Sequence, residues 1–253
     1  MTLSFSSYLI VLPLVFLAGL IDAAAGGGGL ISIPAYLAAG LPVHLAAGTN
    51  KFSACIGTCT ATLRYSRGGY IRWKAGLWAA LLALPGSYLG VYLQQMIPDR
   101  TLNIVLLCML PAAAVCILSS KRMTGHRIQV PPNMVPLISA LTGLFIGMYD
   151  GLIGPGTGTF LIILFMVLLG MDPVNASGTA KIVNLASNLA ALVNYAISGQ
   201  ILYTLGLPAA LMTILGAMTG ARLAMKGGTR VIRFLLIVVL VLLLLTMVQR
   251  LFF

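Results

Sequence analysis

The sequence predicts an all-α polytopic membrane protein built from two inverted-topology repeats of about five segments each. Composition is the first reason: 60% of the 253 residues are hydrophobic, 8% are charged, and the mean hydropathy is +1.04. Soluble domains carry about 25% charged residues, so a soluble protein with a large core is excluded. The second reason is a series of long apolar runs, and the third is an internal recurrence of polar residues and glycines.

Apolar runs bounded by charge or glycine define the expected segments. These are 8–24, 28–40, 43–65, 74–97, 101–119, 132–149, 158–170, 173–197, 204–225 and 230–250. A helix that crosses the hydrocarbon core needs about 20 residues. Segments 28–40 and 158–170 are too short for this. We therefore expect eight long spans and two short half-helices, each a broken or re-entrant arm of a hairpin.

The basic residues indicate the orientation of the chain. Fifteen Lys and Arg face four acidic residues, which gives a net charge of +11. Three basic loops, Arg64–Lys74, Lys121–Arg127 and Lys226–Arg233, contrast with the uncharged loop Ser198–Tyr203. The positive-inside rule places the basic loops in the cytoplasm of a bacterial cell and both termini on the periplasmic side of the inner membrane. Topology accounts for most of the basic charge, so we expect no nucleic-acid partner.

Polar residues and glycines of the first half recur in the second half in the same order. Gly19, Asp22, Gly26 and Gly28 return as Gly147, Asp150, Gly154 and Gly156, and Gly48, Thr49 and Lys51 return as Gly178, Thr179 and Lys181. Equivalent loops differ in charge, so the two halves have opposite orientations. We expect a first inverted repeat at 1–120 with a broken hairpin at 25–51. A basic cytoplasmic linker follows at 121–131, and a second repeat at 132–253 has its broken hairpin at 153–181.

Two lysines lie inside apolar segments, Lys51 and Lys181. A lysine there is costly unless it faces an aqueous cavity or a partner. At equivalent positions of inverted repeats, the two lysines would meet near the pseudo-two-fold axis and could bind a small anion. Two alternatives remain open: lysines that extend to the membrane surface, and lysines neutralised by Asp22 and Asp150.

The polar neighbours of these lysines are candidate substrate ligands, namely Thr49, Asn50, Thr179, Asn184 and Asn188. Buried amides also join membrane helices, so that alternative remains open for each. Glycines at the breaks would let backbone N–H groups approach an anion, and they are Gly28, Gly29, Gly156 and Gly158. Other glycines have a small-xxx-small spacing that predicts helix-packing faces: Gly86 with Gly90, Gly216 with Gly220, and Gly143, Gly147 and Gly151.

Asp22 and Asp150 are candidates either for proton coupling or for ion pairs with the lysines. His44 could titrate at the start of its segment. Cys55 and Cys59 have the spacing of half a metal site, but no further ligand lies near them in the sequence. We therefore expect packing roles for the cysteines, no metal and no cofactor. No Ser/His/Asp set is present in the sequence, so we expect no enzyme.

Two stretches resemble the signatures of the TauE/SafE sulfite exporter family, also called the toluene-sulfonate uptake permeases. They are IDAAAGGGGLISIPAYLAAGLPVHLAAGTNKFSACIGTCTATLRYSRGGYIRWK and YDGLIGPGTGTFLIILFMVLLGMDPVNASGTAKIVNLASNLAALV. The resemblance implies a bacterial inner-membrane permease for sulfur-containing anions, coupled to the proton gradient. It adds Arg64 to the candidate site residues and supports Asp22, Lys51, Asp150 and Lys181. Asn50 is matched by Ala180, so the two half-sites differ chemically.

We therefore predict a secondary transporter, a proton-coupled exporter that works by alternating access. Its substrate would be sulfite or an organosulfonate-type oxyanion held at the midplane between the two repeats. The expected partners are this anion, protons and the lipid bilayer, and a homodimer is left open. The alternatives are a passive anion channel, a transporter of another small anion such as a carboxylate, and a membrane assembly factor.

Overall fold

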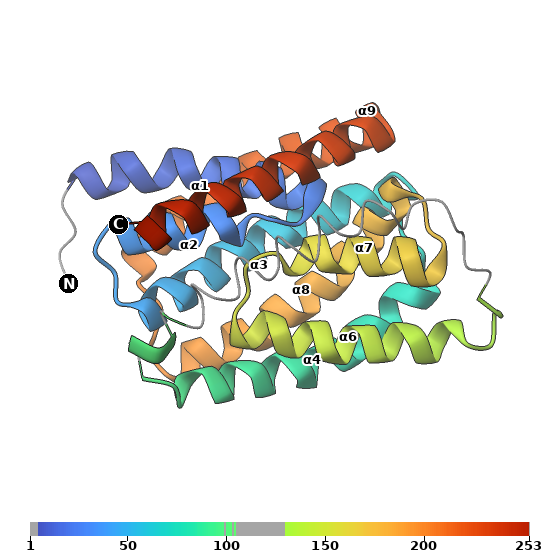
Figure 1. The fold of residues 1–253 in the computed structure, drawn as a ribbon, viewed down its shortest axis with the longest axis horizontal. Coiled ribbons are helices and arrows are strands. Elements are labelled where there is room, and N and C mark those ends of the chain that lie inside the picture. The colour runs from blue at the N-terminus through green and yellow to red at the C-terminus, as the bar shows by residue number, and fades with distance from the viewer. Residues whose placement is uncertain (1–4, 99, 103, 105–129, 253) are drawn as a thin grey trace.

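The computed structural model describes residues 5–98, 100–102, 104 and 130–252 (Figure 1). The helices are α1 (Phe5–Ala25), α2 (Gly29–Ala38), α3 (Val43–Arg67), α4 (Trp73–Gln95), α6 (Val135–Leu152), α7 (Thr157–Leu169), α8 (Pro173–Ile197) and α9 (Tyr203–Phe252). The described residues contain no strand, so the predicted all-α class is confirmed. The backbone leaves helical geometry at Gly228, which separates the predicted segments 204–225 and 230–250.

Within the described part of the chain, four helices are long and apolar enough to cross a membrane, judged by length and composition. They comprise Ser7–Ala25, Trp73–Gln95, Val135–Leu152 and Tyr203–Gly228. Helices α3 and α8 each have 25 residues, and their buried polar side chains lower their hydropathy. The predicted segment 101–119 and the linker 121–131 fall almost entirely outside the described residues. The count of eight long and two short spans and the domain limits remain predictions.

Two short helices follow glycine-rich breaks, as the sequence predicts. Helix α2 has 10 residues and α7 has 13, which correspond to about 15 and 20 Å of helix. Gly26 before α2 has φ +82°, and Gly154 and Gly156 before α7 have φ +87° and +85°. Left-handed backbone of this kind favours glycine because a side chain would clash with the following carbonyl. The chain therefore turns back at each break instead of continuing the preceding helix.

The two breaks pack directly against each other. The Thr159 amide donates to the Gly26 carbonyl at 3.2 Å, and the Thr159 hydroxyl donates to the Ala25 carbonyl at 2.8 Å. A β-carbon built on Gly26 would lie 2.1 Å from the carbonyl carbon of Gly158. Only backbone-to-backbone contact fits at this point, so the tips of the α1–α2 and α6–α7 hairpins meet in the interior.

The long helices pack in two outer pairs around α3 and α8. Helix α4 packs along α6, α1 packs along α9, and α3 and α8 contact each other and these pairs. The predicted small-residue faces lie at the outer contacts. A β-carbon on Gly143 would lie 1.9 Å from the Ala79 carbonyl oxygen, and one on Gly220 would lie 2.0 Å from that of Leu20. These glycines therefore let the backbones of paired helices approach closely.

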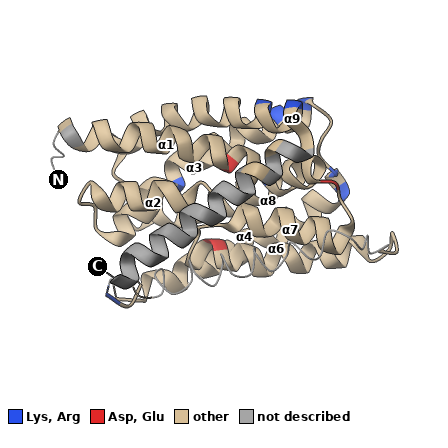
Figure 2. Cartoon of the chain, turned by 45° about the horizontal axis from the view of Figure 1, so that its top comes forward, with Lys and Arg blue, Asp and Glu red and all other residues tan. Residues whose placement is uncertain are grey.

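The outer surface suits a lipid environment. Large apolar side chains are exposed along the outer helices, for example Leu9 and Leu17 on α1, Leu77 and Leu81 on α4, Leu137 and Phe145 on α6, and Leu207 and Leu211 on α9. Figure 2 shows most of the Lys and Arg of the described chain at one end of the helices. This end contains the basic last turn of α3 and the start of α4. An apolar belt with a basic end is the pattern of a polytopic membrane protein.

The turn before α8 carries a capping carboxylate whose effect on stability can be measured. Asp172 Oδ1 accepts hydrogen bonds from the amides of Val174 and Asn175, each at 3.1 Å. Partial burial opposes ionisation, but these bonds and one from the Asn175 side chain outweigh it and lower the pKa of Asp172 below 3.8. Asp172→Ala is expected to destabilise the protein by about 1 kcal/mol at neutral pH, the usual value for a lost N-cap.

Because the pKa is lowered by folding, this stabilisation is present above the unfolded pKa and disappears as the pH falls through the folded value. Asp172→Asn is the matched control, since asparagine can cap the helix but does not titrate. Thermal unfolding midpoints of detergent-purified protein at neutral and acidic pH measure both effects. An alanine variant as stable as the wild type at neutral pH would contradict the prediction.

Candidate functional site

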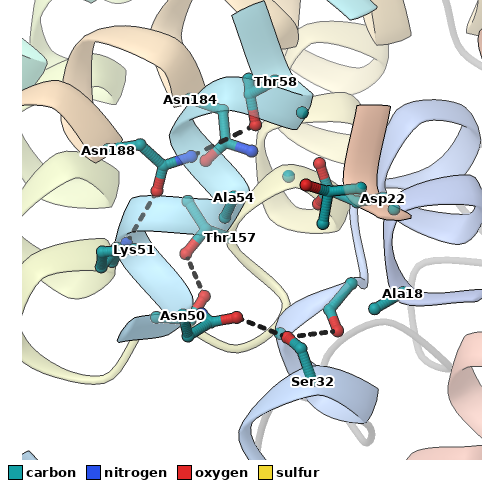
Figure 3. Close-up of a pocket in the computed structure, with 18 of the residues that line it drawn as sticks. Ala18, Asp22, Ser32, Asn50, Lys51, Ala54, Thr58, Thr157, Asn184 and Asn188 are labelled. Carbon is teal, nitrogen blue, oxygen red and sulfur yellow. Dashed lines mark hydrogen bonds between the residues drawn. The ribbon is translucent and has the colours of Figure 1, made fainter. Parts of the chain in front are cut away.

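A polar cavity lies where the hairpin tips meet α3 and α8 (Figure 3). Its volume is about 50 Å³. A cavity of about 10–15 Å³ holds one water, so this one can hold a few waters or a small anion. The lining residues come from both halves of the chain: Ala18, Gly19, Asp22, Gly26, Gly28, Gly29, Ser32, Asn50, Lys51, Ala54, Gly57, Thr58, Asp150, Gly154, Gly156, Thr157, Gly158, Asn184, Asn188 and Thr213.

Lys51 connects α3 to the second half of the chain. Its Nζ donates to Asp150 Oδ2 at 2.7 Å and to Asn188 Oδ1 at 3.0 Å. The same Asp150 oxygen accepts a hydrogen bond from the Ser187 hydroxyl at 2.7 Å. The side chains of Lys51 and Asp150 are 7% and 3% exposed, so the pair is buried and firmly held.

Lys181 makes the corresponding ion pair with the first half. Its Nζ donates to Asp22 Oδ2 at 2.9 Å and also to the Asp22 backbone carbonyl. The Lys181 side chain is fully buried, whereas the Asp22 side chain is 21% exposed and borders the cavity. Each lysine thus pairs with the acid of the other half, which corresponds to the neutralised alternative left open by the sequence. Whether either acid moves protons remains a prediction.

Three buried asparagines surround the same space (Figure 3). Asn50 Oδ1 accepts a hydrogen bond from the Ser32 hydroxyl at 2.6 Å. Asn188 Nδ2 donates to Thr58 Oγ1 at 3.3 Å. Asn184 is 4% exposed, and its side chain has no hydrogen-bond partner among the described residues. Because Asn184 borders the cavity, its amide is available to a ligand there.

Both short helices begin at the cavity. Gly28 and Gly29 line it at the start of α2, and Gly156 and Gly158 line it at the start of α7. The first N–H groups of a helix have no acceptor within that helix, and the helix dipole is positive at this end. Two such ends at one cavity favour an anionic ligand.

Several predicted site residues lie away from this cavity. The hydroxyl of Thr49 accepts the Leu202 amide at 2.9 Å, and that of Thr179 accepts the Arg72 amide at 3.0 Å. Lys181, Arg64 and His44 also do not line it. Arg64 lies in the last turn of α3, and His44 Nε2 lies 3.3 Å from the Ile97 carbonyl. Among the described residues, no three His, Cys, Asp or Glu side chains gather as metal ligands.

Sequence reasoning missed four polar lining residues, Ser32, Thr58, Thr157 and Thr213. Thr58 could have been found, because Lys51, Ala54 and Thr58 lie three to four residues apart and share one face of α3. Thr157 follows Gly156 directly, and its hydroxyl donates to the Gly154 carbonyl at 2.6 Å. No sequence pattern pointed to Thr213, since its position at the cavity depends on how α9 packs.

The apolar exterior, the opposed hairpin tips and the cavity lined by polar residues define a membrane transporter. The family model described as "Sulfite exporter TauE/SafE" matches residues 11–247, and the chain belongs to that family. The resemblance to this family that the sequence motifs indicate is thereby confirmed.

Curated relatives support the same class. "Probable membrane transporter protein ORF9" of a Sinorhizobium species is 37% identical over 225 residues, which are 88% of this chain and 85% of the relative. A "Probable membrane transporter protein" of Haemophilus influenzae is 35% identical over 227 residues, 88% and 87% of the two chains. "Probable membrane transporter protein YfcA" of Escherichia coli K12 is 31% identical over 248 residues, which are 93% of this chain and 90% of the relative. No solved structure matches the chain.

Proposed function

We propose that the protein is a secondary transporter that carries sulfite or a related organosulfonate oxyanion in the cavity between the hairpin tips. The observation that carries the proposal is Asn184, a buried amide that borders the cavity beside Lys51 and has no partner in the described chain. The N-termini of α2 and α7 add positive potential from two sides through their helix dipoles. The family description names sulfite as the substrate class.

We further propose that the two halves are inverted repeats that provide alternating access. The reciprocal contacts support this. Lys51 pairs with Asp150 and Lys181 with Asp22, and Thr49 accepts the Leu202 amide where Thr179 accepts that of Arg72. In both cases, the two residues of the second contact are the counterparts, in the internal repeat, of the two residues of the first contact. Such exchangeable halves around one site are the basis of alternating access in other transporters.

The proposed setting is the inner membrane of a bacterial cell. The basic end of the helices would face the cytoplasm by the positive-inside rule. Helix α1 begins at the end opposite to this basic cluster, which supports a periplasmic N-terminus (Figure 2). Export, proton coupling and the periplasmic C-terminus belong to the same proposal, and a homodimer remains a prediction.

Transport by reconstituted protein tests the proposal. Lys51→Ala is expected to reduce the uptake of labelled sulfite into proteoliposomes at least about tenfold, because a hydrogen bond to a charged group contributes about 1.5–3 kcal/mol. Lys181→Ala is expected to reduce it as well, because Asp22 at the cavity loses the partner that neutralises it. Lys226→Ala, at an exposed position of α9 just before the kink at Gly228, is the matched control and should keep wild-type flux. Unchanged flux in both lysine variants would refute the proposed site.

Because each lysine variant also leaves a carboxylate without its partner, a second variant keeps both ion pairs. Asn184→Ala is expected to raise the KM for sulfite roughly tenfold, the cost of about one hydrogen bond to an anion. Asn194→Ala is its control, since Asn194 is also buried on α8 but does not border the cavity. Equal KM values for the two variants would remove Asn184 from the site. Flux that does not saturate and ignores a pH gradient would indicate a passive channel.

A further inference from the structure

The cavity has no net charge, although it is proposed to bind an anion. Three charged groups line it, Lys51, Asp22 and Asp150. Lys181 lies behind Asp22, and each lysine has a carboxylate oxygen within 3 Å. An added monovalent anion would leave this buried region with one uncompensated negative charge. Charges in a low-dielectric interior are costly unless compensated, so the anion needs an accompanying positive charge.

The two carboxylates differ in their exposure and in the number of hydrogen bonds that they accept. Asp150 is 3% exposed, and its Oδ2 accepts bonds from both Lys51 and Ser187. Asp22 is 21% exposed at the cavity, and its carboxylate accepts a bond from Lys181. Protonation of Asp150 would disturb two side-chain partners, Lys51 and Ser187, whereas protonation of Asp22 would disturb one, Lys181. Both acids line the cavity, and Asp22 is the more exposed of the two.

Lys181 remains hydrogen-bonded when the Asp22 carboxylate loses its charge. Its Nζ also donates to the backbone carbonyl of Asp22, and this acceptor does not titrate. The lysine would therefore keep its place while its positive charge is no longer compensated. That charge acts from directly behind Asp22, while the amide of Asn184 borders the cavity that the anion enters.

The remaining groups around Asp22 do not offer a competing proton site. On α3, Lys51 is held by Asp150, and the Tyr65 hydroxyl donates to the Ala23 carbonyl at 3.1 Å. The cavity-lining residues contributed by α2, α7 and α9 are Gly29, Ser32, Thr157, Gly158 and Thr213, and none of them is charged.

From this asymmetry we propose that the anion and a proton bind together, with the proton on the carboxylate of Asp22. The inference rests on the proposed function and deepens it. The proton comes from the solution that reaches the cavity, attaches to a carboxylate oxygen of Asp22, and leaves with the anion. For a monovalent anion the transported pair is neutral, and the sum of the anion and proton gradients sets the direction of flux. Asp150 and Lys51 form the fixed pair.

Proton uptake during binding tests this assignment. The probe is methanesulfonate, a strong-acid anion whose own charge does not change with pH. Calorimetry of the full-length protein in detergent gives its affinity, and a pH indicator in weakly buffered solution gives the protons taken up. The wild type is expected to take up about one proton per anion at neutral pH, and its affinity should weaken roughly tenfold per pH unit as the pH rises.

Asp22→Asn should bind the anion without proton uptake and with an affinity that does not depend on pH, because asparagine resembles the protonated acid. Asp172→Asn is the matched control at the distant N-cap and should keep wild-type uptake. If Asp22→Asn does not fold, Asp22→Glu replaces it, and the pH dependence of its affinity should be shifted from that of the wild type.

The outcomes separate the two proposals. Proton release on binding, binding with no proton change in the wild type, uptake that persists in Asp22→Asn, or an unshifted pH dependence in Asp22→Glu would each overturn the role of Asp22. Any of these leaves an anion site in place. A wild-type protein that binds neither methanesulfonate nor sulfite would refute the proposed function itself, and the coupling inference with it.

Discussion

Asp150→Ala is expected to destabilise the protein by about 3–5 kcal/mol, because it leaves the buried Lys51 ammonium without its carboxylate. Asn188 Oδ1 remains as an acceptor for Lys51, but an amide does not compensate a charge. The Ser187 hydroxyl also loses an acceptor at 2.7 Å. Equilibrium unfolding in mixed micelles would measure the loss. A change no larger than that of Asp172→Ala would show that Lys51 is not buried against Asp150.

The double variant Lys51→Met with Asp150→Leu separates charge burial from the loss of contacts. Replacing a buried ion pair by apolar residues of similar volume is often neutral or stabilising. The double variant should therefore recover most of the stability lost in Asp150→Ala. Its sulfite flux should remain low, because the cation at the proposed site is gone. Recovery of both stability and flux would mean that the pair is structural and that the anion binds without Lys51.

The helices and their breaks were predictable because local chemistry determines them. Glycine runs at Gly26–Gly29 and Gly154–Gly158 allow left-handed backbone, and an apolar run of 10–13 residues cannot continue as a full span. The small-residue faces were also readable, since glycines four residues apart share one side of a helix. These features require no knowledge of which helices become neighbours.

The pairing of each lysine with a particular acid was not predictable in the same way. The sequence left open whether Lys51 and Lys181 were neutralised, and it could not say that each pairs with the acid of the other half. That choice depends on how α1 and α6 pack around α3 and α8. Thr49 and Thr179 illustrate the same limit. They are polar and next to the lysines, yet their hydroxyls face the loop amides of Leu202 and Arg72.

The unequal cavity lining could be anticipated only in part. Asn50 and Ala180 occupy matching positions, so some asymmetry was visible in the sequence. The larger difference is positional: Lys51 lines the cavity and Lys181 does not, although both recur in the same motif. A repeat in sequence defines which residues correspond, whereas the conformation decides which member of each pair faces the cavity.

Gly26→Ala is expected to cause a second large loss of stability, because two separate energetic costs combine at the hairpin tips. Gly26 has φ +82°, and placing an L side chain in left-handed backbone costs about 1–2 kcal/mol. The new β-carbon would also lie 2.1 Å from the Gly158 carbonyl carbon, and overpacking of this kind adds about 1–3 kcal/mol or more. The tips would have to separate, so both stability and sulfite flux should fall.

Gly69→Ala isolates the first of these costs. Gly69 has φ +74°, but a β-carbon built there meets no atom within 4 Å. The free energy of unfolding of this variant should fall by only about 1–2 kcal/mol, and its sulfite flux should stay at the wild-type level. The difference between the two unfolding free energies therefore measures the contact between the hairpin tips. Equal losses in the two variants would show that Gly26 is needed for its backbone conformation alone and that the tips are free to move apart.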